Sequence, residues 1–330
     1  MIKALFNEFE KTLEILAPSG FEKNLLNYYK EKAEPFCDEV YFDKRGNLVC
    51  KKKNSGAKKL LITAHADEIG IISLYAEENG FIRFSALGGV NLKGLIYRRV
   101  SFANGVTGVI APEQNAKLDE LKITDLYIDV GAGNKCDAEK ILPPLTAGVS
   151  ETTAALMGEK MTSRAIDNKL GCVILFELIK SVKKSDYELY FCFTVEEEVG
   201  LRGAKTVGFD IEPDICLAID VSSSGALPGA KRKGTELSKG AGIRIADAGI
   251  ICNSELVGEL FEAAKKAEVL AQADIKDYAS TDAAALQYTK GGAKTGAIAV
   301  PVRNIHTPAE TVDLNDAVAV FKTVKAFIEG

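Results

Sequence analysis

Short apolar runs that end abruptly in polar or glycine-rich turns recur along this chain. Nearly every residue within them is apolar, and many are β-branched. The runs are LLITA (60–64), ELYFCFTV (188–195), DICLAID (214–220) and GAIAV (296–300). Continuous apolar runs of this length are typical of strands buried on both faces of a largely parallel sheet.

Helical periodicity separates these runs. Residues 168–182 are apolar nearly all round, as expected of a buried helix. Residues 254–269 carry one apolar stripe, with Ser254 as the expected N-cap, and a last helix is expected to begin near Asp313. The first 22 residues have the pattern of an amphipathic helix. Alternating strands and helices predict an α/β fold, a three-layer sandwich around a mixed, largely parallel central sheet.

Residues 71–160 have a different pattern. They are rich in glycine and contain short β-like stretches without a long helical period: FIRFSAL, RRVSFANGVTGVIA and DLYIDVGAG. Such spacing predicts a small all-β domain. Because the α/β pattern resumes at about residue 161, we interpret it as an insertion into a catalytic domain made of residues 1–70 and 161–330.

Composition narrows the class of protein. A chain of 330 residues exceeds the size at which one hydrophobic core stops growing, which favours two domains. The net charge of −5 argues against nucleic acid or an anionic membrane as the main partner. No apolar run reaches the ~20 residues that span a bilayer. Seven cysteines form no C-x-x-C pair, which favours reduced structural thiols and a cytoplasmic location.

Candidate ligands follow the first two apolar runs. His65, Asp67 and Glu68 come directly after the first run, and open α/β sheets bind ligands at the carboxyl ends of their strands. Taken alone, this segment fits a solvated loop equally well. The triplet 196–198, three glutamates, follows the second run. Such a triplet is usually a solvated face, but in a cleft the carboxylates would repel and require a cation.

Three further candidates stand at similar positions. Asp220 ends the third run, His306 lies beyond the fourth, and Asp167 precedes the buried helix. Considered singly, Asp167 is best explained as a helix cap, and a lone histidine is more often structural than a ligand.

Considered together, these residues indicate a metal site. Both histidines of the chain lie at strand ends, and acids lie at the others. Imidazole and carboxylate ligands suit zinc, cobalt or manganese. Two divalent ions would be neutralised by Asp167, Glu198, Asp220 and one hydroxide, which leaves Glu197 free to transfer protons.

Five of these segments resemble the motif set of the tetrahedral aminopeptidases. They are HADEIG, RAIDNKLG, TVEEEVGLRGA, LAIDV and VRNIHTPAE. That dinuclear metallopeptidase family includes glutamyl, leucyl, lysyl and deblocking aminopeptidases and proteins named endoglucanase M. Further similarities at PSGFE, DKRGNL, LYIDVGA and STDAAAL extend the resemblance over essentially the whole chain.

The resemblance implies a ligand set for two ions, zinc or cobalt and alternatively manganese. Asp167 would bridge the ions, His65 and Asp220 would complete one site, and Glu198 and His306 would complete the other.

It also implies roles outside the ligand set. Glu197 would be the catalytic base, Asp67 would orient His65, and the Asp167–Asn168 peptide bond would be cis. The fold would be that of the zinc exopeptidases. The inserted domain would make dimer contacts, and the subunits would assemble into a hollow tetrahedral dodecamer.

The function expected is removal of N-terminal residues from peptides with a free N-terminus, through a metal-bridging hydroxide and a glutamate base. Two alternatives stay open, a glycoside hydrolase that uses paired carboxylates and an inert metal-binding scaffold. The preferred N-terminal residue is not determined. Arg202, Arg303 and the basic residues of 231–233 could line a pocket for an acidic side chain, or could be surface charges.

Overall fold

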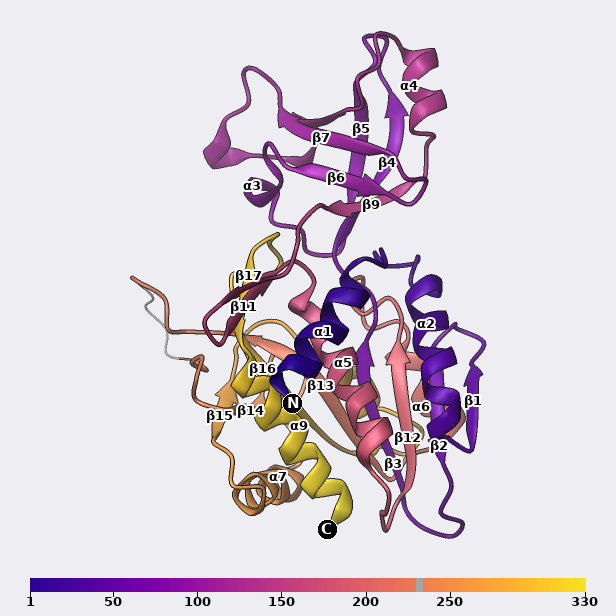
Figure 1. Ribbon diagram of the computed structural model, residues 1–330, viewed down its shortest axis with the longest axis vertical. Coiled ribbons are helices and arrows are strands. Elements are labelled where there is room, and N and C mark those ends of the chain that lie inside the picture. The colour runs from indigo at the N-terminus through magenta and orange to yellow at the C-terminus, as the bar shows by residue number, and fades with distance from the viewer. Residues whose placement is uncertain (230–233) are drawn as a thin grey trace.

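The protein has two parts, a large α/β sandwich and a small barrel that stands on one end of it (Figure 1). The computed structural model describes residues 1–229 and 234–330. The chain enters the barrel at Gly70, directly after a central strand of the sandwich, and leaves it at Ser150. The barrel is therefore an insertion, as the sequence pattern predicts.

The sandwich is built on one mixed sheet of eleven strands within the described residues. From edge to edge, the main path runs through β1 (Glu39–Phe42), β2 (Leu48–Lys52), β12 (Glu188–Thr194), β3 (Lys59–His65), β13 (Ile215–Ser223), β16 (Lys294–Arg303), β17 (Glu310–Asp313), β11 (Lys160–Ser163) and β10 (Ala155–Met157). A side branch pairs β14 (Ala241–Ala246) with β16 and with β15 (Ala271–Ile275).

The four central strands β12, β3, β13 and β16 are parallel, and the outer pairs on the main path are antiparallel. Because side chains alternate along a strand, neighbouring residues enter different cores. In β3, Leu60 and Ile62 pack into the largest hydrophobic cluster, whereas Leu61 packs into a smaller cluster on the other face. Burial on both faces explains why the sequences of these strands are continuous apolar runs.

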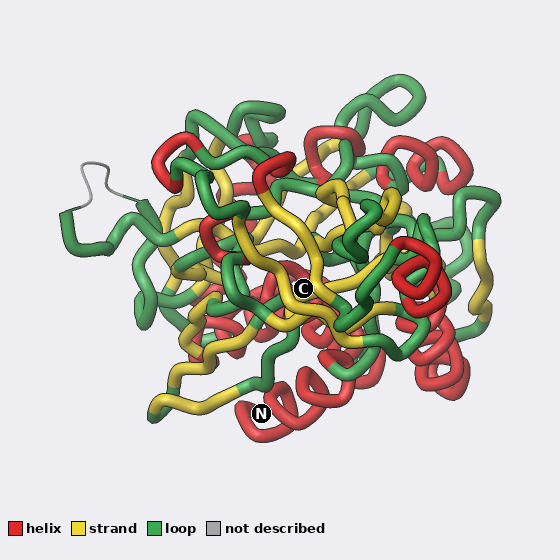
Figure 2. Tube along the Cα trace, turned by 90° about the horizontal axis from the view of Figure 1, so that it is seen from above, coloured by secondary structure: helices red, strands yellow, loops and turns green. Residues whose placement is uncertain are grey.

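Helices cover both faces of the sheet, and Figure 2 shows helical segments on either side of the strands. One face carries α1 (Ile2–Leu13), α2 (Lys23–Ala33), α5 (Ile166–Ser181), α7 (Ser254–Lys266) and α9 (Leu314–Glu329). The other carries α6 (Ala204–Ile211) and α8 (Asp282–Leu286). A short 3-10 turn, Glu34–Phe36, follows α2. The predicted three-layer sandwich is confirmed.

The inserted part is a closed antiparallel barrel with its own core. Its strands follow the order β4 (Gly70–Ala76), β5 (Ile82–Leu87), β8 (Leu126–Asp129), β7 (Thr107–Pro112), β6 (Arg99–Phe102) and β9 (Ala147–Ser150). Two short helices, α3 (Leu92–Leu95) and α4 (Lys135–Ile141), and 3-10 turns at Leu118–Glu120 and Ile123–Asp125 connect the strands. Phe84, Phe102 and Ile128 are among the residues that fill the barrel.

The start of α7 differs from the sequence pattern. The N-cap of α7 is Asn253, not Ser254: its side chain accepts a hydrogen bond from the backbone N–H of Leu256 at 3.0 Å. Ser254 is already helical, and the helix ends at Lys266. The last helix does begin after Asp313, whose carboxylate accepts from the N–H of Asn315 at 2.9 Å.

Among the described residues, no helix has both the length and the apolar character needed to cross a membrane. All seven cysteines lie in the described part of the chain and are free thiols, and five of them are buried. The expectation of reduced structural thiols agrees with this arrangement.

Candidate metal centre and catalytic cavity

A cavity of about 480 Å³ opens at the carboxyl ends of the central strands. All five predicted ligands and the predicted base contribute to its wall: His65, Asp167, Glu197, Glu198, Asp220 and His306. They come from β3, the start of α5, the loop after β12, β13 and the loop after β16. The topology brings these distant segments together because parallel strands end at the same edge of a sheet.

Asp167 lies between the two histidines. Its Oδ1 atom is 3.0 Å from Nε2 of His65, and its Oδ2 atom is 3.2 Å from Nε2 of His306. Each carboxylate oxygen therefore faces a different imidazole, which is the geometry required of a ligand shared by two ions.

The other acids divide between the histidines. Near His65, Oδ1 of Asp220 is 3.7 Å and Oε2 of Glu197 is 3.9 Å from Nε2. Near His306, Oε1 of Glu198 is 3.2 Å from Nε2. Two groups of three side chains bring their candidate ligand atoms within 4.8 Å of one another, close enough to hold one ion. One group is His65, Asp167 and Glu198, and the other is His65, Glu197 and Asp220.

The charge balance of the cluster favours cations. Burial raises the pKa of Glu197 well above its ordinary value, and burial also raises the pKa values of Glu198 and Asp220. For Asp167, burial acts in the same direction, but hydrogen bonds with His306 and His65 outweigh it and lower the pKa. Four carboxylates buried side by side repel one another, and divalent ions would relieve that repulsion.

The carboxylates around both histidines also favour a positive charge at the imidazole rings. Burial disfavours a charged imidazole, but hydrogen bonds to Asp167 and Glu198 outweigh it and raise the pKa of His306 to about 12. For His65, burial is likewise outweighed, chiefly by the negative charge of Glu197 and by Asp167, and the pKa is raised well above its ordinary value. A metal ion would replace the proton on each Nε2 atom.

A backbone carbonyl holds the second nitrogen of each ring. Nδ1 of His65 is 3.1 Å from the carbonyl oxygen of Asp67, and Nδ1 of His306 is 3.0 Å from that of Gly89. A carbonyl can only accept a hydrogen bond, so Nδ1 carries the proton in both rings. If a metal ion replaced the proton on Nε2, the lone pair of each ring would be directed to the place where the carboxylates converge, as metal ligation requires.

Asp67 braces the loop that carries the two glutamates. Its Oδ1 accepts a hydrogen bond from the backbone N–H of Glu197 at 2.9 Å, and its Oδ2 accepts from that of Glu198 at 3.1 Å. The hydroxyl of Ser19 donates to Oδ2 at 2.7 Å. Asp67 also lies beside His65, with Oδ1 3.5 Å from Nδ1.

The first glutamate of the triplet faces away from the cavity. The carboxylate of Glu196 pairs with Arg45 at 2.6 Å and with Arg202 at 2.9 Å. The usual interpretation of a glutamate triplet as a solvated face therefore applies to one of its three members. Arg202 is occupied by this pair at the surface.

Asp167 is not the cap of the buried helix. The capping bond is made by the next residue: the backbone N–H of Gly171 donates to Oδ1 of Asn168 at 3.1 Å. Asp167 and Asn168 have non-helical backbone angles, and the peptide bond between them is cis, as the resemblance implies. With Asn168 as the cap, the carboxylate of Asp167 is free to face the histidines.

The sequence patterns did not single out Glu310, which lies in β17 behind the site. Its Oε1 atom accepts a hydrogen bond from the backbone N–H of His306 at 2.8 Å, and its Oε2 atom accepts from that of Asp167 at 3.1 Å. Burial raises the pKa of Glu310 well above its ordinary value. His306 has a left-handed backbone with φ +60°. One carboxylate thus positions two candidate ligands, and its only sequence signal is its place at the end of VRNIHTPAE.

The basic residues on the cavity wall differ from those expected. They are Arg244 and Lys276, whereas Arg303 does not contribute to the described wall. Both basic groups are paired with Asp274, Arg244 at 2.7 Å and Lys276 at 3.8 Å. Arg244 also pairs with Asp247 at 2.7 Å. The candidates Lys231, Arg232 and Lys233 lie outside the described residues.

Known proteins are similar to this chain in sequence and in fold. The M42 glutamyl aminopeptidase family model matches residues 46–322. A protein from Acetivibrio thermocellus that is named as an aminopeptidase is 37% identical over 326 residues, which cover 98% of each chain.

Solved structures agree over nearly the full length. An aminopeptidase from the archaeon Desulfurococcus kamchatkensis superposes with a TM-score of 0.95 at 34% identity, covering 99% of this chain and 95% of that one. The TET1 peptidase of Pyrococcus horikoshii, described as assembling into a tetrahedron or a large octahedral shell, gives 0.88 at 29% identity over 98% and 99%. A structure titled endoglucanase from Thermotoga maritima gives 0.82 at 26% over 97% and 96%. The chain belongs to the M42 glutamyl aminopeptidase family.

Proposed function

We propose that this chain is a dinuclear metal-dependent aminopeptidase that removes N-terminal residues from peptides. The family supplies the aminopeptidase activity. The observation that supports two ions is the position of Asp167, whose two oxygens each face a different histidine. A site for a single ion would not require a carboxylate placed between two imidazoles.

The donor set fits two divalent ions of the zinc, cobalt or manganese type. In this proposal Asp167 would be a ligand to both ions. His65 and Asp220 complete the first site, and Glu198 and His306 complete the second. The contacts between side chains support this division, because Asp220 lies near His65 and Glu198 lies near His306.

When bound, the ions would lower the pKa of a coordinated water and polarise the scissile carbonyl. Glu197 then acts as the base that accepts a proton from the attacking water. As the carbon–nitrogen bond breaks, Glu197 returns that proton to the leaving amine. Its position supports this role, because Oε2 lies within the cluster at 3.9 Å from Nε2 of His65. Asp67 holds the backbone of Glu197 in place.

The free amino group of the substrate is proposed to bind beside the acids of the cluster. His65, Asp167 and Glu198 contribute to the cavity wall, so a peptide that binds with its free N-terminus beside them would present its first residue for removal. An acetylated N-terminus lacks the positive charge that these carboxylates attract, and it should not be processed.

The assembly proposed is the one described for a solved relative, and the location proposed is cytoplasmic. The inserted barrel would form a dimerisation domain between the two segments of the catalytic domain. The segment predicted for it, 71–160 between 1–70 and 161–330, extends past the barrel, because β10 and the start of β11 pair in the sheet of the sandwich. Dimers would build a tetrahedral dodecamer, supported by the tetrahedral assembly described for the Pyrococcus horikoshii peptidase. The free buried thiols are consistent with a cytoplasmic protein.

Hydrolysis of aminoacyl p-nitroanilides tests the activity. We expect cleavage by the purified full chain, loss of activity on exhaustive chelation, and recovery when zinc, cobalt or manganese is restored. N-acetylated substrates serve as the matched control and should stay intact. Activity that survives complete removal of metal would contradict the proposal.

Glycoside hydrolysis is the second candidate, and the structure titled endoglucanase is the observation in its favour. Paired carboxylates suit that chemistry, but it requires neither histidines nor metal. Carboxymethyl cellulose assayed beside the nitroanilides separates the two. Hydrolysis of cellulose by the chelated protein would support the glycosidase, and binding of metal without hydrolysis of either substrate would support an inert scaffold.

A further inference from the structure

The inserted barrel contacts one of the proposed metal ligands. The carbonyl oxygen of Gly89, in the loop between β5 and α3, accepts the hydrogen bond from Nδ1 of His306 at 3.0 Å. His65 has no such link to the barrel, because its Nδ1 atom is paired with the carbonyl of Asp67 next to its own strand. One histidine is thus oriented from within the sandwich and the other from the barrel.

The barrel loop approaches so closely that a Cβ atom on either glycine would make a tight contact. A Cβ atom on Gly89 would lie 3.0 Å from Nδ1 and 3.3 Å from Cε1 of His306. A Cβ atom on Gly88, which has a φ of +83°, would lie 3.0 Å from Cβ of Glu198. The two glycines therefore pack against the two residues proposed to complete the second ion site.

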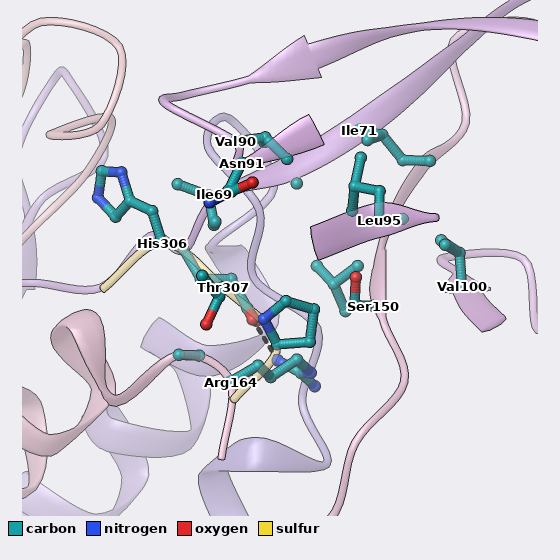
Figure 3. A pocket seen from close by; sticks show the side chains of 16 residues that line it. Ile69, Ile71, Val90, Asn91, Leu95, Val100, Ser150, Arg164, His306 and Thr307 are labelled. Carbon is teal, nitrogen blue, oxygen red and sulfur yellow. Dashed lines mark hydrogen bonds and ion pairs between the residues drawn. The ribbon is translucent and has the colours of Figure 1, made fainter. Parts of the chain in front are cut away.

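The contact continues along the loop that follows His306. The backbone N–H of Asn91 donates to the carbonyl of His306 at 3.4 Å, and a Cβ atom on Gly94 would lie 3.3 Å from Cδ of Pro308. Figure 3 shows Val90 and Asn91 close to the loop that carries His306. The crevice between the barrel and the sandwich here encloses only about 30 Å³. On this side the ring therefore packs closely against the barrel, whereas its other side borders the catalytic cavity of about 480 Å³.

We propose that Gly88 and Gly89 make the barrel a structural part of the second ion site, so that the position of the barrel sets the affinity for the ion held by Glu198 and His306. This inference rests on the proposed function, since it assumes two ions. Gly89 is a positioning residue: it fixes the tautomer and the direction of the His306 ring through its carbonyl. The first site, at His65 and Asp220, has no contact of this kind and should not respond to the barrel.

Gly89→Ala in the full chain tests the proposal. The added methyl group forces the ring or the loop to shift by a few tenths of an ångström. Loss of such an outer partner typically weakens metal binding about 10–100-fold. Cobalt(II) titrated calorimetrically into the metal-free protein should show one of two ions binding about 10-fold more weakly and the other unchanged. Gly133→Ala, at a barrel glycine with open space around it, is the matched control and should match the wild type.

A second background identifies the weakened site. Glu198→Ala removes a ligand of the second site, and in that background Gly89→Ala should leave the remaining ion unaffected. Gly94→Ala places a methyl group against Pro308 and should weaken the same ion by a smaller factor, which keeps the test available if Gly89→Ala does not fold.

The outcomes separate this inference from the proposed function. If the wild type binds fewer than two cobalt ions, the dinuclear assignment fails before any variant is compared, and the inference fails with it. If the wild type binds two, unchanged binding in the Gly89 and Gly94 variants would overturn the inference alone. Equal weakening of both ions would overturn it as well. Selective weakening of the ion that depends on Glu198 would support it.

Discussion

The carboxylate of Asp67 accepts a hydrogen bond from the backbone amide of Glu197 at 2.9 Å. The same carboxylate accepts from the amide of Glu198 at 3.1 Å and lies against His65, so a buried acid that need not touch metal connects the proposed base to the ligands of both ions. Perturbing this connection should affect chemistry and metal binding together, whereas perturbing the base alone should not.

Asp67→Asn tests that connection. The amide has only one oxygen, so one of the two backbone N–H groups would face an NH2 group in place of an acceptor. We expect metal affinity to fall about 10–100-fold, as for other outer partners of ligands. Metal content after dialysis and kcat on an aminoacyl p-nitroanilide measure the two effects. Full occupancy with unchanged kcat would show that the Asp67 carboxylate is dispensable.

Glu197→Gln removes the proposed base and keeps its shape. We expect kcat to decrease by about 10²–10⁴-fold, because the amide cannot accept the proton from water. Metal content, measured by atomic emission, should stay at the wild-type level. Glu196→Gln is the matched control, since that neighbour pairs with Arg45 and Arg202 outside the cavity, and it should retain activity. A fully active Glu197 variant would refute the assignment.

Glu310→Gln loosens two ligands at once. The glutamine can accept from the backbone N–H of Asp167 or of His306, but its NH2 group would face the other donor. An unsatisfied buried donor costs about 1–3 kcal/mol, so the free energy of unfolding of the metal-free protein should decrease by that amount. Urea denaturation provides the measurement. A variant as stable as the wild type would mean that Glu310 does not hold these backbones.

Asp316 gives a pH dependence far from the metal centre. It accepts hydrogen bonds from the backbone N–H groups of Ser238 and Gly240, yet burial raises its pKa from 3.8 to about 6. Between these values the folded chain binds more protons than the unfolded chain, so this group's contribution to stability falls as the pH rises from about 4 to 6. The Tm of the wild type minus that of Asp316→Asn should therefore decrease over this range and level off above it. A difference that is independent of pH would contradict the raised pKa.

Much of the fold could be predicted because the chain follows simple periodicities. Leu60, Leu61 and Ile62 enter two different cores, and this double burial produces the continuous apolar run that indicates a central parallel strand. The barrel was recognisable by its short strands and glycines. Helix caps were less certain, because adjacent polar residues compete for the same role: Asn253 caps in place of Ser254, and Asn168 in place of Asp167.

The candidate site was predictable as far as side chains at strand ends define it. The chain's two histidines and the acids at neighbouring ends converge because parallel strands finish together. The residues that position these candidate ligands could not be predicted in the same way. Gly89 acts through its backbone carbonyl, and Glu310 acts through the backbone N–H groups of two other residues. Every residue has a backbone carbonyl, and every residue except proline has a backbone N–H, so the residue type does not mark these roles. Their roles arise from contacts across long separations in sequence, so only the folded structure distinguishes them.

Anomalous diffraction from crystals of the full chain grown with zinc tests the central claim most directly. The account predicts two peaks per subunit, one on each side of the Asp167 carboxylate, the first beside His65 and Asp220 and the second beside Glu198 and His306. A single peak, or a pair in which neither ion touches Asp167, would contradict it.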